Sequence, residues 1–137
     1  MKFWHINVYS KDNMEHMINR NMAYIGLGNN IQDYEQRVHK NRLTTPWQFK
    51  KFNETANIGD WVFLYQDKIG YIVYGIYSGK ISEPTIDYEF APDWSKTEIQ
   101  KHILVDTWIP IKNPTTKYYQ RRTLIEIKSD PLKIIFN

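Results

Sequence analysis

The feature that most constrains this chain is a pair of strand-forming runs joined by a short turn. WVFLYQ and YIVYGIYSGKI are rich in aromatic and β-branched residues, and the polar segment DKIG stands between them. These compositions favour strands and a tight turn respectively. The sequence therefore predicts a β-hairpin over Trp61 to Ile81, with NIGD as the turn before it. Gly75 predicts a bulge, or a bend of the kind that closes small barrels.

The other segments predict further strands and short helices around this hairpin. Ser10 and Asn30 stand where they can cap two amphipathic helices, and Pro46 favours a turn or a helix start. We expect strands over 2–10, 22–28, 103–111 and 122–130, helices over 10–20 and 29–42, one or two helical turns over 96–102, an acidic loop over 82–94, and a short closing element over 131–137. The predicted fold is α+β, a single domain over 1–137 with a small curved or barrel-like sheet flanked by two or three helices.

Composition sets limits on the function. The chain has 137 residues, 42% hydrophobic and 24% charged, which is typical of a soluble domain with a core. No apolar run approaches a membrane span and the N-terminus lacks a secretory pattern, so we expect an intracellular protein with no membrane partner. Without cysteine, and with its four histidines scattered, the chain is not expected to hold a metal or a cofactor.

The first strand, KFWHINVYS, alternates two kinds of side chain. Trp4, Ile6 and Val8 share one face and predict a core contact. The other face is polar and aromatic, and we expect it to be free to touch a ligand. Its Asn7 can also satisfy a buried backbone group, and its His5 is expected to be a surface or hydrogen-bonded residue and not a metal ligand.

Aromatic residues make up 15% of the chain, too many for a core of this size to hide completely. Trp4, Trp61 and Trp108 lie within strand-forming runs and are expected in the core. Trp47 and Trp94 instead lie in polar segments next to prolines. Either ring can pack as a lid or contact a ligand.

The charges are segregated although the net charge is only +3. Basic residues gather in two stretches, around 37–51 and 117–133, and an acidic stretch lies between them. If folding brings the basic stretches together, they can attract phosphates. The phosphate-binding candidates are Arg42, Lys50, Lys51, Arg121 and Arg122.

The order KFWHINV, helix, AYIGLG, helical stretch, aromatic segment, IGDWVFLYQ, VYGIYSGKI resembles the EVE and YTH domains of the PUA-like superfamily. It is most similar to the base-recognition domains attached to modification-dependent restriction enzymes. The resemblance covers roughly residues 2 to 81. It implies a PUA-like fold with a pocket that takes one flipped-out, often methylated nucleobase between aromatic rings.

The resemblance also implies where the base would bind. The pocket residues become Tyr9 and Asn13 after the first strand, then Leu27, Gly28 and Asn29 after the Ile-Gly element. A ring from Trp47 or Trp94 would complete the cage. Related domains commonly have a cage tryptophan after the Ile-Gly pair, where this chain has Leu27. The expected partner is DNA or RNA, and no catalytic residue is assigned.

Two alternatives remain open. A protein-interaction or inhibitor module could use exposed aromatic residues as hot spots. A metal-dependent nuclease could use Asp60, Asp67 or Asp106 with Lys68. No hydrolase, P-loop or zinc-deaminase motif is present in the sequence.

Overall fold

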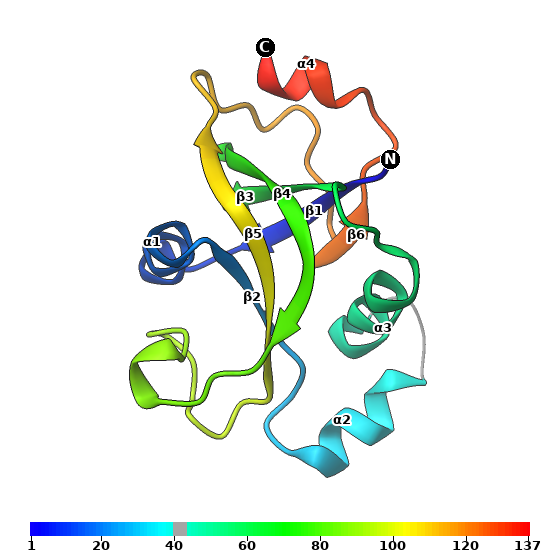
Figure 1. Cartoon of the computed structure of the whole chain (residues 1–137), viewed down its shortest axis with the longest axis vertical. Helices are drawn as coiled ribbons and strands as arrows, with labels where there is room; N and C mark the ends of the chain where they lie inside the picture. The colour runs from blue at the N-terminus through cyan, green and yellow to red at the C-terminus, as the bar shows by residue number, and fades with distance from the viewer. Residues whose placement is uncertain (40–43) are drawn as a thin grey trace.

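The structure is a computed structural model that describes residues 1–39 and 44–137 (Figure 1). It is an α+β domain built on one six-stranded mixed sheet. The strands are β1 (Phe3–Val8), β2 (Met22–Gly26), β3 (Trp61–Gln66), β4 (Gly70–Ser82), β5 (Gln100–Pro110) and β6 (Leu124–Glu126). The helices are α1 (Lys11–Arg20), α2 (Ile31–Val38), α3 (Thr45–Thr55), α4 (Pro131–Ile135) and the 3-10 turn η1 (Asp87–Glu89).

The strand order is β2-β5-β4-β3-β1-β6. β1 pairs in parallel with β3, and all the other pairs are antiparallel. In the described part of the chain β2 and β6 are the sheet edges, so the sheet is curved but open and the barrel-like prediction is wrong. The edge strand β6 has only three residues, and residues 127–137 after it form α4 and no further strand.

The predicted hairpin is confirmed as β3 and β4, joined by a turn in which Lys68 has a positive φ of 64°. The bulge at Gly75 is confirmed as well, because the β4–β5 register shifts between Gly75 and Tyr77. A Cβ at Gly75 would lie 2.8 Å from the carbonyl oxygen of Thr107 and 2.9 Å from the Trp108 ring. Glycine therefore lets β5 cross β4 closely at this point.

Local signals placed most helices correctly. The Ser10 side chain accepts a hydrogen bond from the Asn13 N–H, and the Asn30 side chain accepts one from Asp33, so both predicted caps are confirmed. Pro46 lies at the start of α3. The structure has four helices among the described residues where two or three were expected, because α3 and the closing α4 both form.

Two predicted boundaries are wrong. The segment 96–102 was expected to be helical, but Gln100–His102 begins β5 and pairs with the end of β2. Lys, Glu and Gln are good helix formers, but intrinsic propensity is a weak determinant and the pairing with β2 overrides it. The strand expected over 122–130 is confined to Leu124–Glu126.

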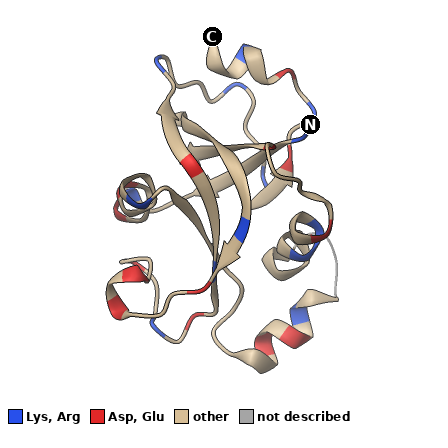
Figure 2. Cartoon of the chain, viewed as in Figure 1, with Lys and Arg blue, Asp and Glu red and all other residues tan. Residues whose placement is uncertain are grey.

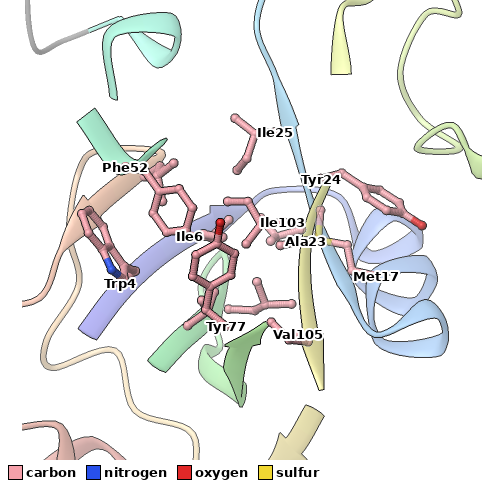
Figure 3. Close-up of a cluster of buried hydrophobic side chains, with 14 of the residues drawn as sticks. Trp4, Ile6, Met17, Ala23, Tyr24, Ile25, Phe52, Tyr77, Ile103 and Val105 are labelled. Atoms are coloured by element: carbon pink, nitrogen blue, oxygen red, sulfur yellow. The ribbon is translucent and has the colours of Figure 1, made fainter. Parts of the chain in front are cut away.

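Apolar residues form two clusters, one on each face of the sheet. In the main core, Trp4 and Ile6 of β1 lie close to Phe52 of α3 and Tyr77 of β4 (Figure 3). The second cluster includes Phe63 and Tyr71 and is covered by Ile134 of α4. No helix in the described residues is long and apolar enough to cross a membrane.

Because both clusters touch β1, the strand is buried on both faces, and the prediction of a free polar face is wrong. His5 is fully buried and its Nδ1 lies 2.9 Å from the Tyr71 hydroxyl. The Asn7 amide nitrogen donates to the hydroxyls of Tyr9 (3.1 Å) and Tyr119 (3.4 Å), not to a backbone group. The three strand tryptophans lie in or against the two clusters, as expected.

Candidate functional site

A cavity of about 430 Å³ opens where β1 ends. Its walls come from segments that are distant in the sequence: the end of β1 and the start of α1, β2 with the turn after it, the start of α3, and the loops around 93–98 and at 123. The lining residues are Asn7, Val8, Tyr9, Ser10, Asn13, Met17, Tyr24, Gly26, Asn29, Thr45, Asp93, Trp94, Ser95, Glu98 and Thr123. We call it the first cavity.

The first cavity brings together four of the seven residues expected to contact a base: Tyr9, Asn13, Asn29 and Trp94. Asn13 is buried, Asn29 is exposed, and the Trp94 ring is half-buried against the main core. Tyr9 is 62% exposed, and its hydroxyl accepts the hydrogen bond from Asn7. These residues come from three separate segments, so only the tertiary fold makes them neighbours.

The other three expected residues lie elsewhere. Leu27 is completely buried in the main core, so it cannot take the place of a cage ring. Gly28 is buried beside it with a φ of +134°, and a Cβ there would meet the Asp33 carboxylate, which explains the glycine. Trp47 lines a second cavity, described below. Of the two candidate rings, Trp94 is the one in the first cavity.

The loop that bears Trp94 is fixed at both ends. At one end the Asp93 N–H donates to Asn13 Oδ1 (3.0 Å), and the Ser10 hydroxyl donates to the Asp93 carboxylate. At the other end the Gly28 N–H donates to Glu98 Oε1 (3.0 Å). This end is reinforced by backbone hydrogen bonds between residues 27–28 and Ile99. The loop is therefore a wall held against α1 and the end of β2.

Sequence reasoning missed Asp93 and Glu98 as lining residues. Asp93 lies in the segment expected to be an acidic loop and Glu98 in the segment expected to be helical. No local pattern indicates that their carboxylates accept hydrogen bonds from Ser10 and from the Gly28 N–H. Tyr24 was missed too. Its ring lies 5.2 Å from the His16 ring and 4.4 Å from the His102 ring, measured between centroids.

Burial keeps Tyr24, which lines the first cavity, and His102, which packs against the Tyr24 ring, uncharged. It raises the pKa of Tyr24 to about 12, so the hydroxyl stays protonated at neutral pH. It lowers the pKa of His102 to about 4, against a smaller opposing effect of the Glu89 carboxylate. The charges at the first cavity are therefore negative, from Asp93 and Glu98, and no Lys or Arg is among its described lining residues.

A second, smaller cavity of about 200 Å³ lies between α3 and β6. Its lining includes the rings of Trp4 and Trp47 together with two of the expected phosphate ligands, Lys51 and Arg122. The two basic stretches thus meet here. Figure 2 shows the acidic segment around η1 at the lower left, away from α3 on the right.

Among the described residues, the others expected to bind phosphate do not line the second cavity. Lys50 pairs with Glu54 one turn later in α3, at 3.5 Å. Arg121 is exposed in a shallow hollow with Tyr119 and Arg122. Arg42 lies outside the described residues.

Two of the three carboxylates named for the nuclease alternative, Asp60 and Asp67, do not converge. Asp60 and Asp67 lie beyond opposite ends of β3, roughly 20 Å apart for a six-residue strand. Asp60 is buried and accepts hydrogen bonds from the backbone N–H groups of Lys2 and Asn57 and from Trp4 Nε1, which gives it a structural role. Among residues 1–39 and 44–137, no group of three or more acidic or histidine side chains could hold a metal ion.

Comparison with models of known protein families finds no match, and comparison with curated protein sequences finds none either.

Proposed function

We propose that this chain is a nucleic-acid-binding module of the EVE and YTH kind, which accepts one flipped nucleobase in the first cavity. The single observation that supports it most is the convergence of Asn13, Asn29 and Trp94 on one cavity. A volume of about 430 Å³ lies within the usual range of small-ligand pockets.

The chemistry of the lining suits a base better than a phosphate. Trp94 offers a ring face on which a base can stack. The asparagine amides can both donate to and accept from a base edge, while the carboxylates of Asp93 and Glu98 can accept from its ring N–H and amino groups. Those carboxylates would repel a phosphate. A methyl group on the base would add apolar area against Trp94.

The proposal is tested with four nucleosides: 2′-deoxycytidine, 2′-deoxyadenosine, and their 5-methyl and N6-methyl derivatives. NMR titration of the labelled protein should shift the amides of Asn13, Asn29 and Trp94 together with at least one of them. Trp94→Ala should weaken that binding about ten- to a hundredfold, because stacking on an aromatic ring is worth about 1–3 kcal/mol.

Trp47→Ala is the matched control, since it removes the same ring from the second cavity and should leave nucleoside binding unchanged. Asn29→Ala guards against misfolding, because Asn29 is exposed and its backbone N–H would keep its bond to Asp33. It should weaken binding without lowering the melting temperature. If no nucleoside shifts these amides, base recognition is wrong and the protein-interaction alternative becomes the stronger hypothesis.

A further inference from the structure

The second cavity is an apolar slot with a basic rim. Trp4, Trp47, Leu124 and Ile125 supply ring and aliphatic surface, Lys51 and Arg122 supply two positive charges, and Glu126 supplies one negative charge. At about 200 Å³ it is smaller than a typical small-molecule pocket, so it suits one ring system and not a larger ligand.

The two cavities are neighbours divided by a pair of threonines. Thr45 and Thr123 both line the first cavity, and their hydroxyl oxygens lie 3.4 Å apart. Two residues beyond Thr45, Trp47 lines the second cavity, and so does Arg122 directly before Thr123. The linings of the two cavities therefore share two segments, the start of α3 and the residues just before β6.

This division is held by a buried contact. The side chain of Gln48 on α3 accepts a hydrogen bond from the backbone N–H of Leu124 on β6 (2.9 Å). It fixes α3 against the edge strand, so the slot between them is preformed. A preformed site loses less conformational entropy on binding than one that must be assembled.

The charges of the two cavities are complementary. The first has two carboxylates. The second is lined by Lys51, Arg122 and Glu126; within the described residues the two cations form no ion pair, while the Glu126 carboxylate is paired with Lys128 at 3.1 Å. The charge balance therefore disfavours a phosphate at the first cavity and favours one at the second, where two cations outnumber one paired carboxylate.

We propose that the second cavity binds the neighbouring nucleotide of the same strand, with its base against Trp47 and its phosphate on Arg122 and Lys51. This rests on the proposed function, because it assumes that a base occupies the first cavity. A strand presents a base, a phosphate and a further base in turn; the first cavity would take one base, and the rings and cations of the second would take the next base and its phosphate.

The test compares two modified nucleosides, 5-methyl-2′-deoxycytidine and N6-methyl-2′-deoxyadenosine, with the trinucleotides that carry each between two thymidines. A trinucleotide should bind at least tenfold more tightly than its nucleoside. Trp47→Ala and Arg122→Gln should each remove most of that gain and leave nucleoside affinity unchanged. Lys50→Gln is the matched control, since Lys50 lies beside Lys51 but pairs with Glu54, and it should keep the gain.

A second measurement needs no variant. In the parent protein the methyl resonances of Leu124 and Ile125 should shift with a trinucleotide and not with a nucleoside. If a nucleoside binds but its trinucleotide binds no more tightly, or Leu124 and Ile125 do not move, the second site is wrong and base recognition stands. If the gain in affinity depends on Arg122 but not on Trp47, the second cavity contacts only a phosphate, and the proposed binding of a second base against Trp47 is wrong. If neither probe binds, the proposed function itself fails.

Discussion

At the scale of single residues, His5 shows why the polar character of β1 does not indicate a ligand. Its ring is packed among Tyr65, Tyr71 and Tyr119, and its Nδ1 lies within hydrogen-bond distance of Tyr71. Burial lowers its pKa to about 3, against a smaller opposing effect of the Arg122 backbone. Burial also raises the pKa of Tyr71 and Tyr65, so both hydroxyls stay neutral. The imidazole is thus held uncharged among neutral groups.

This predicts a dependence of stability on pH. In the unfolded chain His5 binds a proton below about pH 6.5, whereas in the folded chain it does so only near pH 3. The neutral, buried His5 therefore contributes its full stability above pH 6.5, and this contribution is lost as the pH falls from 6.5 towards 3. Between pH 7 and 5 the His5 contribution to the free energy of unfolding should fall by about 2 kcal/mol. Urea unfolding at several pH values measures it. His5→Gln should remove this part of the pH dependence and leave the part that the lowered pKa of His102 contributes. Equal profiles for the parent and His5→Gln would contradict the assignment.

At the scale of elements, the sequence predicts what short-range chemistry decides. The β3–β4 hairpin and the caps at Ser10 and Asn30 depend on residues a few positions apart, and all three are confirmed. The fate of Asn7 depends instead on Tyr119, more than a hundred positions away, and no local pattern contains that contact.

The candidate site divides in the same way. Asn13, Asn29 and Trp94 were named from a family resemblance and do line one cavity, whereas Leu27 and Gly28, named on the same ground, do not. Glu98 could not be named, because its partner, the Gly28 N–H, is a backbone group that carries no sequence signal. In the same way, the charge pattern indicated that the two basic stretches could meet in the fold, but not that Lys51 and Arg122 would line one cavity.

The loop of the first cavity gives a prediction at this scale. Glu98→Ala removes the acceptor of the Gly28 N–H, so amide hydrogen exchange at Gly28 and Trp94 should become faster by at least tenfold, because a lost hydrogen bond to a charged group costs about 1.5–3 kcal/mol. Glu98→Gln keeps an oxygen acceptor in the same place and should retain most of the protection. If Ala and Gln have the same effect, the loop is held by charge or by its backbone contacts to Ile99 and not by this hydrogen bond.

At the scale of the whole molecule, the positions of the charged residues are more informative than the net charge. The net charge of +3 is too small to predict a polyanion partner on its own. The fold nevertheless brings Lys51 and Arg122 to one cavity, and keeps the acidic segment around η1 on another side of the molecule (Figure 2). If strands bind by the route proposed here, their salt dependence must come from these two cations and not from the total charge.

The last prediction tests whether the salt dependence of strand binding comes from Lys51 and Arg122 or from the total charge. The probe is a single-stranded DNA decamer with one central 5-methylcytosine, and its affinity is measured by fluorescence anisotropy between 50 and 200 mM KCl. For single strands each phosphate contact contributes about 0.7 to the slope of log affinity against log salt, so the double variant Lys51→Gln, Arg122→Gln should reduce the slope by about 1.4. The double variant Lys80→Gln, Lys96→Gln removes the same net charge from residues that line neither cavity and should keep the parent slope. Equal flattening by both pairs would mean that the decamer responds to net charge alone, and the proposed binding of a strand across the two cavities would be wrong.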